Sequence, residues 1–225
     1  SLNKVMYNDI INAGMEAKDL GAVYGGRNLT HLGNEICYNH IVNYVREEAT
    51  DDVVAGVYLD DGMSGTKVYN NIIENADRGV FTNGGSQNTI NNNVLVNCKR
   101  GIVTGANPIT GFTMDYDSNN KEVSLTKYAE LFFAANPAYA EKLTDLDLTK
   151  LTVGAADFKA SATVSGNRFK GCASNWDNAA YKNGTEYNTS DDVYAEVTGD
   201  DNVAVTEILK AYAEADIDTN DIGLL

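Results

Sequence analysis

Two adjacent acidic residues, Asp60 and Asp61, open a Gly-containing turn and are the side chains best suited to chemistry. Neighbouring carboxylates raise one another's proton affinity, so that one can act as an acid while the other stays ionised. Glycoside hydrolysis uses a pair of carboxyl groups in this way. Asp-Asp-Gly is also ordinary turn chemistry, and two adjacent acids suit Ca²⁺. Catalysis, a plain turn and an ion-binding turn are therefore three alternatives for this segment.

The acidic turn follows one of four similar segments that read as strands, namely residues 21–24, 55–58, 78–81 and 100–103. Successive residues of a strand face opposite sides, so aliphatics at the third position would point into the core and the next residues outward. This alignment predicts an exposed aromatic row formed by Tyr24, Tyr58 and Phe81. If the phase is shifted by one residue, the same rings fill the core, and that alternative stays open.

Polar residues lie close to the predicted aromatic row. Asp60 and Asn83 stand two positions beyond it, and Arg27 aligns with Asp61 one repeat away. Sugars stack their C–H faces on aromatic rings while their hydroxyls need hydrogen-bond partners. We therefore expect a carbohydrate partner, with Asp60 and Asp61 as catalytic candidates. The substrate-binding candidates are Tyr24, Arg27, Tyr58, Phe81 and Asn83.

A repeat predicts the elements that position these residues. An aliphatic residue is followed three positions on by Asn, with starts at residues 5, 36, 68 and 90 (spacings of 31, 32 and 22) and a degraded copy at residue 164. Such a period marks stacked supersecondary units. Stacked Asn side chains can bond one another in a ladder. The pattern predicts a right-handed parallel β-helix in which one column contains Asn8, Asn39, Asn71, Asn93 and Asn167.

The repeat stops between about residues 105 and 160, where the sequence predicts a helical insertion into a single domain spanning residues 1–225. Ser124 is a predicted N-cap, and Pro137 can start a second helix. The insertion either walls the acidic turn or merely packs against the coils. In the first case Asp115 or Asp117 could serve as the partner acid for one of the pair.

The terminal regions carry two further expectations. The polar stretch from residue 173 to residue 225 contains an amphipathic segment, residues 203–214, that predicts a helix covering one end of the stack. The first repeat starts at Val5 with nothing to cover its sheet edge, so we expect either additional chain before Ser1 or a processed or truncated form.

The net charge of −15 opposes binding to nucleic acid and to anionic membrane surfaces. No segment is long and apolar enough to predict a membrane-spanning helix, so membrane insertion is not expected. A hydrophobic fraction of 43% with only two prolines argues against disorder. No cofactor is expected, although Ca²⁺ bridging acidic side chains to a glycan is possible.

Cysteines and histidines complete the set of reactive side chains. Cys98 and Cys172 fall in one column of the repeat, where neighbouring coils lie about 4.8 Å apart. That spacing allows a disulfide, but non-cysteine residues elsewhere in the column favour two stacked thiols. His40 falls on a different strand from the acidic turn, so a role as its base is not expected. His31 lies in a turn beside a strand of the predicted aromatic row, with no partner indicated by spacing.

Several segments resemble secreted right-handed parallel β-helix proteins of the pectin-lyase-like superfamily, which are frequent in polysaccharide-degrading bacteria. They are Gly21-Ala-Val-Tyr-Gly-Gly-Arg27, Gly56-Val-Tyr-Leu-Asp-Asp-Gly-Met-Ser-Gly65, Arg78-Gly-Val-Phe-Thr-Asn-Gly-Gly85 and Asp221-Ile-Gly-Leu-Leu225. The resemblance covers residues 2–104 well and residues 163–172 weakly. It implies a secreted, periplasmic or cell-surface protein that acts on polysaccharides.

The resemblance implies two activities. Polygalacturonase-like hydrolases use an Asp-Asp pair similar to Asp60-Asp61, but their Asn-Thr-Asp, Gly-His-Gly and Arg-Ile-Lys segments are absent from this sequence. The pectate-lyase branch uses Ca²⁺ with an Arg or Lys base, for which Arg27 is the candidate here. The sequence therefore favours a glycoside hydrolase, with a polysaccharide lyase and a non-catalytic binding or structural module as alternatives.

Overall fold

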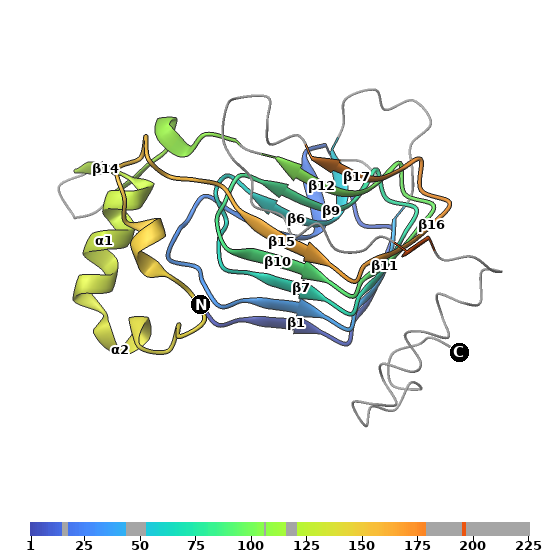
Figure 1. The fold of residues 1–225 in the computed structure, drawn as a ribbon, viewed down its shortest axis with the longest axis horizontal. Coiled ribbons are helices and arrows are strands. Elements are labelled where there is room, and N and C mark those ends of the chain that lie inside the picture. Colours follow the sequence, from blue (N-terminus) through green and yellow to red (C-terminus); the bar gives the residue numbers. More distant parts are fainter. Residues whose placement is uncertain (15–17, 44–52, 106, 116–120, 179–194, 197–225) are drawn as a thin grey trace.

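The computed structural model describes residues 1–14, 18–43, 53–105, 107–115, 121–178 and 195–196. Most of its strands belong to three parallel sheets, and the chain visits these sheets in turn (Figure 1). Each pass of the chain, called a coil below, adds one strand to every sheet. The parallel sheets stacked in this way are compatible with the predicted parallel β-helix.

The first sheet contains β1 (Lys4–Met6), β4 (Glu35–Cys37), β7 (Lys67–Tyr69), β10 (Asn88–Asn91) and β15 (Ala162–Ser165). The second contains β2 (Asp9–Ile11), β5 (His40–Val42), β8 (Ile72–Glu74), β11 (Val94–Val96), β16 (Arg168–Lys170) and β18 (Ala195–Glu196). The third contains β3 (Leu20–Gly26), β6 (Val54–Asp60), β9 (Arg78–Asn83), β12 (Arg100–Gly105) and β17 (Ser174–Asn178).

The strand register confirms the alignment of the repeats. In the first sheet the aliphatic residue of each repeat pairs with that of the next, through Val5, Ile36, Val68, Ile90 and Val164. These residues belong to one apolar core, in which Val5 is partly buried and the other four are buried. The degraded fifth repeat joins the same column because the chain returns to the stack after the insertion.

The third sheet faces the same core with the predicted phase. Val57, Val80 and Ile102 are fully buried, and Val23 packs against them from the first coil. Glycine precedes the aliphatic in three of these strands because a larger residue would collide with the second sheet. A Cβ at Gly56 or Gly79 would lie 2.4 Å from a methyl group of Ile73 or Leu95, respectively.

The predicted asparagine ladder is confirmed. From Asn8 to Asn93, each side-chain amide donates to the Oδ1 of the Asn in the next coil over 2.9 to 3.0 Å, and the backbone N–H of the same Asn donates to that oxygen too. Four members, from Asn39 onward, are buried, whereas Asn8 is exposed at the end of the stack. The ladder thus satisfies backbone groups that the tight corner between two sheets would otherwise leave unpaired. Its members are Asn8, Asn39, Asn71, Asn93 and Asn167.

The second Asn of the repeat serves the next corner of the coil. Asn12, Asn75 and Asn97 have φ between 52° and 56°, and Gly171 takes the equivalent place with φ of 63°. Asn and Gly tolerate this left-handed conformation better than other residues. The substitution of Gly for Asn in the degraded repeat therefore keeps the turn.

The insertion begins where β12 ends and finishes where β15 begins. It contains a short antiparallel hairpin and two helices, which lie together at one end of the sheets (Figure 1). The elements are η1 (Ile109–Gly111), β13 (Thr113–Asp115), β14 (Glu122–Ser124), α1 (Leu125–Ala135), α2 (Pro137–Ala140) and η2 (Leu148–Leu151). Ser124 caps α1 by accepting from the Lys127 N–H, and Pro137 opens α2, as the sequence predicts.

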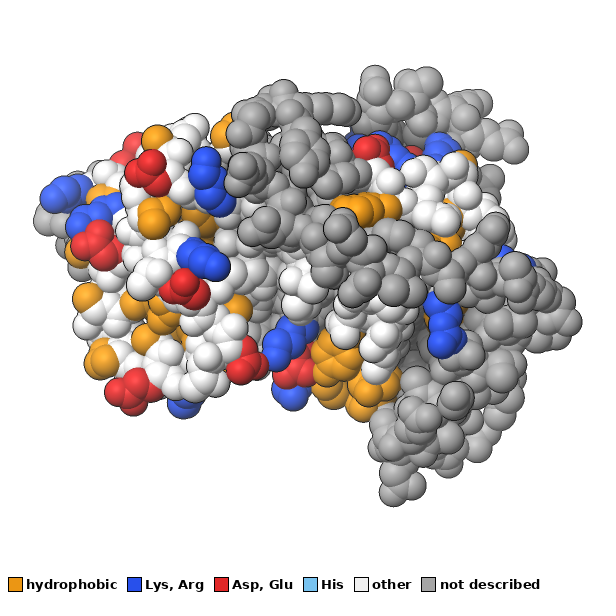
Figure 2. All heavy atoms as spheres, in the orientation of Figure 1, with side chains coloured by type: hydrophobic (Ala, Val, Ile, Leu, Met, Phe, Trp, Pro, Cys, Tyr) orange, Lys and Arg blue, Asp and Glu red, His pale blue; other side chains and the backbone are white. Residues whose placement is uncertain are grey.

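The insertion has an apolar core of its own. Leu125, Ala129 and Phe133 of α1 pack with Leu29 and Leu32, which lie between β3 and β4. Acidic and basic side chains are interspersed on its visible face (Figure 2), so the net negative charge does not collect there. The packing fixes the insertion beside the turns that follow β3 and β6.

The predicted helix over residues 203–214 lies outside the described residues. Among the helices that are described, none is both long enough and apolar enough to cross a membrane.

Candidate functional site

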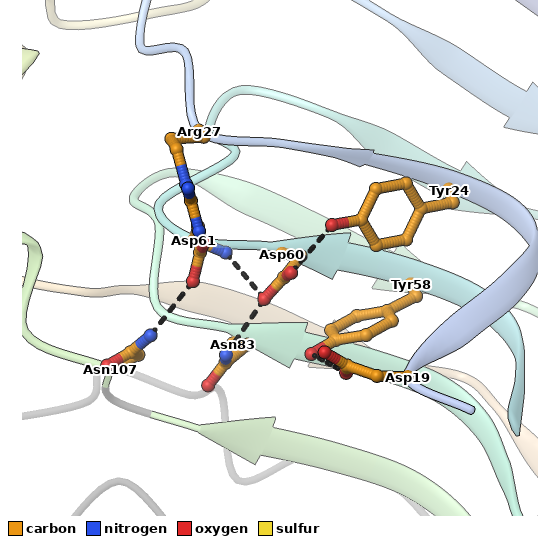
Figure 3. A network of polar contacts seen from close by, with 8 residues as sticks. All are labelled: Asp19, Tyr24, Arg27, Tyr58, Asp60, Asp61, Asn83 and Asn107. Carbon is orange, nitrogen blue, oxygen red and sulfur yellow. Dashed lines mark hydrogen bonds and ion pairs between the residues drawn. The ribbon is translucent and has the colours of Figure 1, made fainter. Parts of the chain in front are cut away.

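In the third sheet, the predicted site residues of three consecutive coils lie side by side. Tyr24 pairs with Tyr58, and Tyr58 pairs with Phe81, in neighbouring parallel strands. The acidic turn comes two residues after Tyr58, where β6 ends. Figure 3 shows the polar side chains that converge on this turn from β3, β6, β9 and the start of the insertion.

The aromatic column lies outside the coil core, as predicted, but the expectation of an exposed row is wrong for two of its three rings. Tyr24 is 54% exposed, whereas Tyr58 and Phe81 are 2% and 6% exposed. Tyr58 and Phe81 stack with their centroids 4.6 Å apart, and the Arg78 guanidinium lies 4.2 Å from the centre of the Phe81 ring. Tyr24 contacts Tyr58 edge-on at 5.3 Å and stands at the end of the column.

Asp60 is held by neutral donors. The Tyr24 hydroxyl donates to its Oδ2 over 2.7 Å, and the Asn83 amide donates to its Oδ1 over 2.8 Å. The backbone N–H of Asp61 donates to the same Oδ1 over 2.8 Å. Asp60 therefore ties together three consecutive coils, because its partners come from β3 and β9.

Asp61 has a different set of partners. Arg27 donates to its Oδ2 through Nε at 2.9 Å and also through a terminal nitrogen, and Asn107 donates to its Oδ1 over 3.0 Å. The backbone at Asp61 is left-handed, with φ of 42°, which turns its side chain away from that of Asp60. The repeat alignment places Arg27 one coil from Asp61, and the two residues pair in the structure.

The two carboxylates do not open onto one solvent-filled groove. Asp60 is 5% exposed and Asp61 is 7% exposed, and each of their four carboxylate oxygens accepts a hydrogen bond from the protein. The alternative partner acids do not join them, because Asp115 is an exposed residue of β13 and Asp117 lies outside the described residues. Neighbouring coils supply the side-chain donors to Asp60, whereas the first coil and the insertion supply those to Asp61.

The buried acids change the acidity of their partners. Burial raises the pKa of Tyr24 to about 12, with the hydrogen bond and the negative charge of Asp60 adding to the shift. Burial also raises the pKa of Tyr58, and Asp60 and Asp19 raise it further. The hydrogen bond and charge of Asp61 raise the pKa of Arg27. Both tyrosines are therefore protonated hydroxyl donors, and Arg27 is a permanent cation.

Three residues of the site could not be predicted from the repeat alignment. Asn107 and Phe112 come from the insertion, and Phe112 places its ring 4.8 Å from the Arg27 guanidinium carbon. Asp19 precedes β3 and accepts from the Tyr58 hydroxyl over 3.2 Å. Their positions follow from how the insertion and the preceding turn fold back, so no column of the alignment could indicate them.

A small cavity of about 130 Å³ opens beside Tyr24 at the first coil. Its lining includes Asn34 and Glu35 together with Val23 and Met63, which pack in the coil core. A small ligand group can enter it next to the strand that carries Tyr24.

His40 lies in the second sheet, in the column predicted for it. The acidic turn follows a strand of the third sheet. The Nδ1 of His40 lies 3.0 Å from Asp9 Oδ1 and its Nε2 lies 2.8 Å from Glu74 Oε1. His31, in the turn after β3, has its Nε2 3.3 Å from the amide nitrogen of Asn28. Neither ring contacts Asp60 or Asp61 in these interactions.

Within the described ranges, no group of three or more His, Cys, Asp or Glu side chains is arranged to hold a metal ion. The acidic turn contributes only two carboxylates, and their oxygens already accept hydrogen bonds. Scanning the chain against protein-family models found no match, and searches of curated proteins and of solved structures found none either. The inference of function therefore depends on the geometry of the site.

Proposed function

We propose that this protein binds a carbohydrate chain on the surface formed by Tyr24, Arg27 and the cavity beside Tyr24. The observation that carries the proposal is the state of Tyr24: its ring is 54% exposed, yet its hydroxyl is anchored on Asp60 and its edge on Tyr58. A rigid exposed ring loses little conformational entropy when a ligand stacks on it. Asp60 is a positioning residue in this proposal.

The surroundings of Tyr24 supply hydrogen-bonding groups for sugar hydroxyls. Arg27 has a side chain that is 62% exposed and oriented by Asp61 and Phe112, so its remaining N–H groups can donate outward. Asn34 and Glu35 line the adjacent cavity, but their polar atoms already have partners: the Asn34 amide donates to the His31 carbonyl, and the Glu35 carboxylate accepts from Tyr69 and pairs with Lys4. The exposed Tyr24 ring and the outward N–H groups of Arg27 therefore supply the apolar and the polar contacts for a sugar.

Glycoside hydrolysis by Asp60 and Asp61 is the second candidate. It is favoured by two adjacent carboxyl groups in unlike surroundings, one with neutral donors and one with a guanidinium. A general acid must come within hydrogen-bond reach of the glycosidic oxygen. Because both acids are buried and fully hydrogen-bonded, hydrolysis requires a movement that releases one of them, and simple binding does not.

A lyase mechanism has weaker support. A base that abstracts a proton near neutral pH needs a pKa close to the operating pH. Asp61 shifts the pKa of Arg27 upward, which is the opposite direction. Arg27 is better suited to donating hydrogen bonds than to accepting a proton.

For the architecture, we infer a right-handed parallel β-helix of the pectin-lyase-like type, in a secreted, periplasmic or cell-surface protein. The support is the parallel order of all three sheets and the general preference of parallel crossovers for the right hand. A surface location would also place the site where polysaccharides occur.

The binding proposal can be tested by titrating the protein with a panel of neutral and acidic oligosaccharides and measuring affinity by calorimetry. We expect Tyr24→Ala to weaken binding of the best ligand about tenfold or more, since one aromatic contact contributes on the order of 1.4 kcal/mol. Tyr7→Ala is the matched control, because Tyr7 is in the same coil but stacks on Tyr38 beside the first sheet. Equal loss in both variants would contradict the proposal.

The same panel separates binding from catalysis. New reducing ends that disappear in Asp60→Asn would establish hydrolysis. Unsaturated products that absorb in the ultraviolet would indicate a lyase. A ligand that binds and is recovered intact is the expected result.

A further inference from the structure

Two cysteines from distant parts of the sequence lie side by side at the corner after the second sheet. Val96 of β11 pairs with Lys170 of β16, and each strand is followed two residues later by a cysteine, Cys98 or Cys172. The Ala173 N–H donates to the Cys98 carbonyl over 3.1 Å, so the two coils stay in register through this corner. Neighbouring parallel strands lie about 4.8 Å apart, which is within the Cα separation that a disulfide spans.

Both cysteines are free thiols, and each side chain lies close enough to shift the pKa of the other. Cys98 is 1% exposed, whereas Cys172 is only partly buried. Each sulfur also lies near a carbonyl of the preceding coil, 3.7 Å from Ile73 for Cys98 and 3.5 Å from Leu95 for Cys172. The pair therefore combines a partly exposed cysteine with a buried one in the adjacent coil.

We propose that Cys98 and Cys172 form a redox site, in which a small-molecule disulfide converts the stacked thiols reversibly into an intramolecular disulfide. The Cys172 thiolate attacks one sulfur of the reagent, and a thiolate leaves with the electron pair of the broken bond. The Cys98 thiol then gives its proton to water and attacks the Cys172 sulfur, which releases the second thiolate. One reagent disulfide is reduced to two thiols while the two protein thiols are oxidised.

The surroundings decide which cysteine reacts first. The hydrogen bond from Cys98 lowers the pKa of Cys172 although partial burial opposes it. The pKa of Cys98 is raised by the same hydrogen bond and by burial. Cys172 is itself partly exposed, and an open cavity of about 500 Å³ lies beside this corner with Cys98, Lys99 and Gly171 in its wall. Cys172 is thus the entry thiol, and Cys98 is the thiol that resolves the mixed disulfide.

The disulfide would close the long segment between residues 98 and 172, which contains the whole insertion. Asn107 and Phe112, which contact Asp61 and Arg27, lie inside that segment. Closing a loop of this length constrains the unfolded chain. The oxidised protein should therefore unfold at a higher temperature while the reduced protein keeps the same fold.

To test the proposal, the full chain is equilibrated with reduced and with oxidised glutathione and analysed by peptide mapping and thermal unfolding. We expect oxidation to yield a Cys98–Cys172 peptide that has lost two hydrogens, and to raise the Tm by roughly 5 to 15 °C. Reduction should reverse both changes. Without oxidant, phenylarsine oxide, which bridges paired thiols, should bind the reduced protein at one equivalent.

Two variants make the test specific. Cys37→Ser removes a buried cysteine of β4 and should retain the disulfide, the Tm shift and the arsenical binding. Cys172→Ala should lose all three, and its Tm should match that of the reduced wild type within a few degrees. A disulfide that involves Cys37, or wild-type protein that shows neither the linked peptide nor arsenical binding, would overturn the proposal.

Discussion

The asparagine ladder and the acidic turn are both buried polar clusters, yet they are built in opposite ways. The ladder repeats one residue in every coil, and each member bonds to the next copy of itself. The acidic turn collects different residues, and its two acids take partners from three coils and from the insertion. The ladder therefore depends only on regular stacking, whereas the acidic turn depends on which coil carries each residue.

The two clusters also differ in what their buried polar groups do. Inside the ladder every amide is used to satisfy the backbone of a corner, so no group is left for a ligand. At the acidic turn the buried acids hold exposed partners, Tyr24 and Arg27, which keep free surface. Changes in the ladder should thus act mainly on stability, and changes at the acidic turn mainly on the properties of the exposed partners.

The largest effect is expected for Asn71→Leu in the middle of the ladder. The substitution removes the acceptor for the backbone N–H of Asn39 and the donor to the Ile36 carbonyl, both in buried surroundings. Each unpaired buried group costs about 1–3 kcal/mol, so the free energy of unfolding should fall by roughly 2–5 kcal/mol. Urea unfolding followed by circular dichroism measures this change.

Asn8→Leu is the matched control for that experiment. Asn8 occupies the same column but is exposed at the end of the stack, where water can replace the lost partners. Its cost should stay below about 1 kcal/mol. Equal costs at both positions would mean that the ladder stabilises the fold through side-chain packing and not through satisfied hydrogen bonds.

An intermediate effect is expected for Asp60→Asn at the acidic turn. The amide oxygen can still accept from Asn83 and from the backbone, and the Tyr24 hydroxyl can reverse its role and accept, so the loss of stability should be about 1–2 kcal/mol. Burial and the Asp60 carboxylate together hold the pKa of Tyr24 at about 12. Removing the charge should lower the pKa of Tyr24 toward its ordinary value near 10.

Ultraviolet titration of tyrosinate measures this shift, and Tyr24→Phe identifies which step belongs to Tyr24. Asp115→Asn serves as the control, since it removes an exposed carboxylate from β13. If Tyr24 titrates at the same pH in Asp60→Asn as in the wild type, burial alone sets its pKa, and Asp60 is not its positioning residue.

The smallest effect concerns His40, which lies in a third polar cluster with Asp9 and Glu74. Burial acts to lower the pKa of His40, but the two carboxylates outweigh it and the pKa is raised. The stabilisation by protonated His40 is therefore fully present below the unfolded pKa near 6.5 and is lost as the pH rises through the folded pKa. His40→Asn should remove about 1 kcal/mol or less of this pH-dependent stability, once solvent screening is allowed for.

His31→Asn gives the opposite sign and completes the test. Burial and the positive N-terminus lower the pKa of His31, so its protonation favours the unfolded chain as the pH falls. Relative to the wild type, the stability of His40→Asn should improve between about pH 6 and pH 8, and that of His31→Asn should decline. Denaturant unfolding at about pH 6 and about pH 8 measures these differences. If the free energy of unfolding changes with pH equally in all three proteins, both charge effects are ruled out.

The sequence by itself determined the parts of the molecule that repeat. The aliphatic and Asn columns and the stacking of Cys98 with Cys172 follow from the spacing of the repeat. The physical reason is that each coil meets only a copy of itself above and below, so a residue's neighbours can be read from the period. Alternation in the strands predicted that Val57 and Tyr58 lie on opposite sides, and the structure decided that Val57 is the one that faces the core.

Only the tertiary structure decided how exposed the outer side is. Tyr58 and Phe81 are buried and stack on one another, with Arg78 over the Phe81 ring, while Tyr24 stays exposed at the end of the column. The insertion brings Asn107 to Asp61, and no spacing in the sequence relates those two residues. Alternation determines which side of a strand a residue occupies, but solvent access depends on the segments that fold over that side.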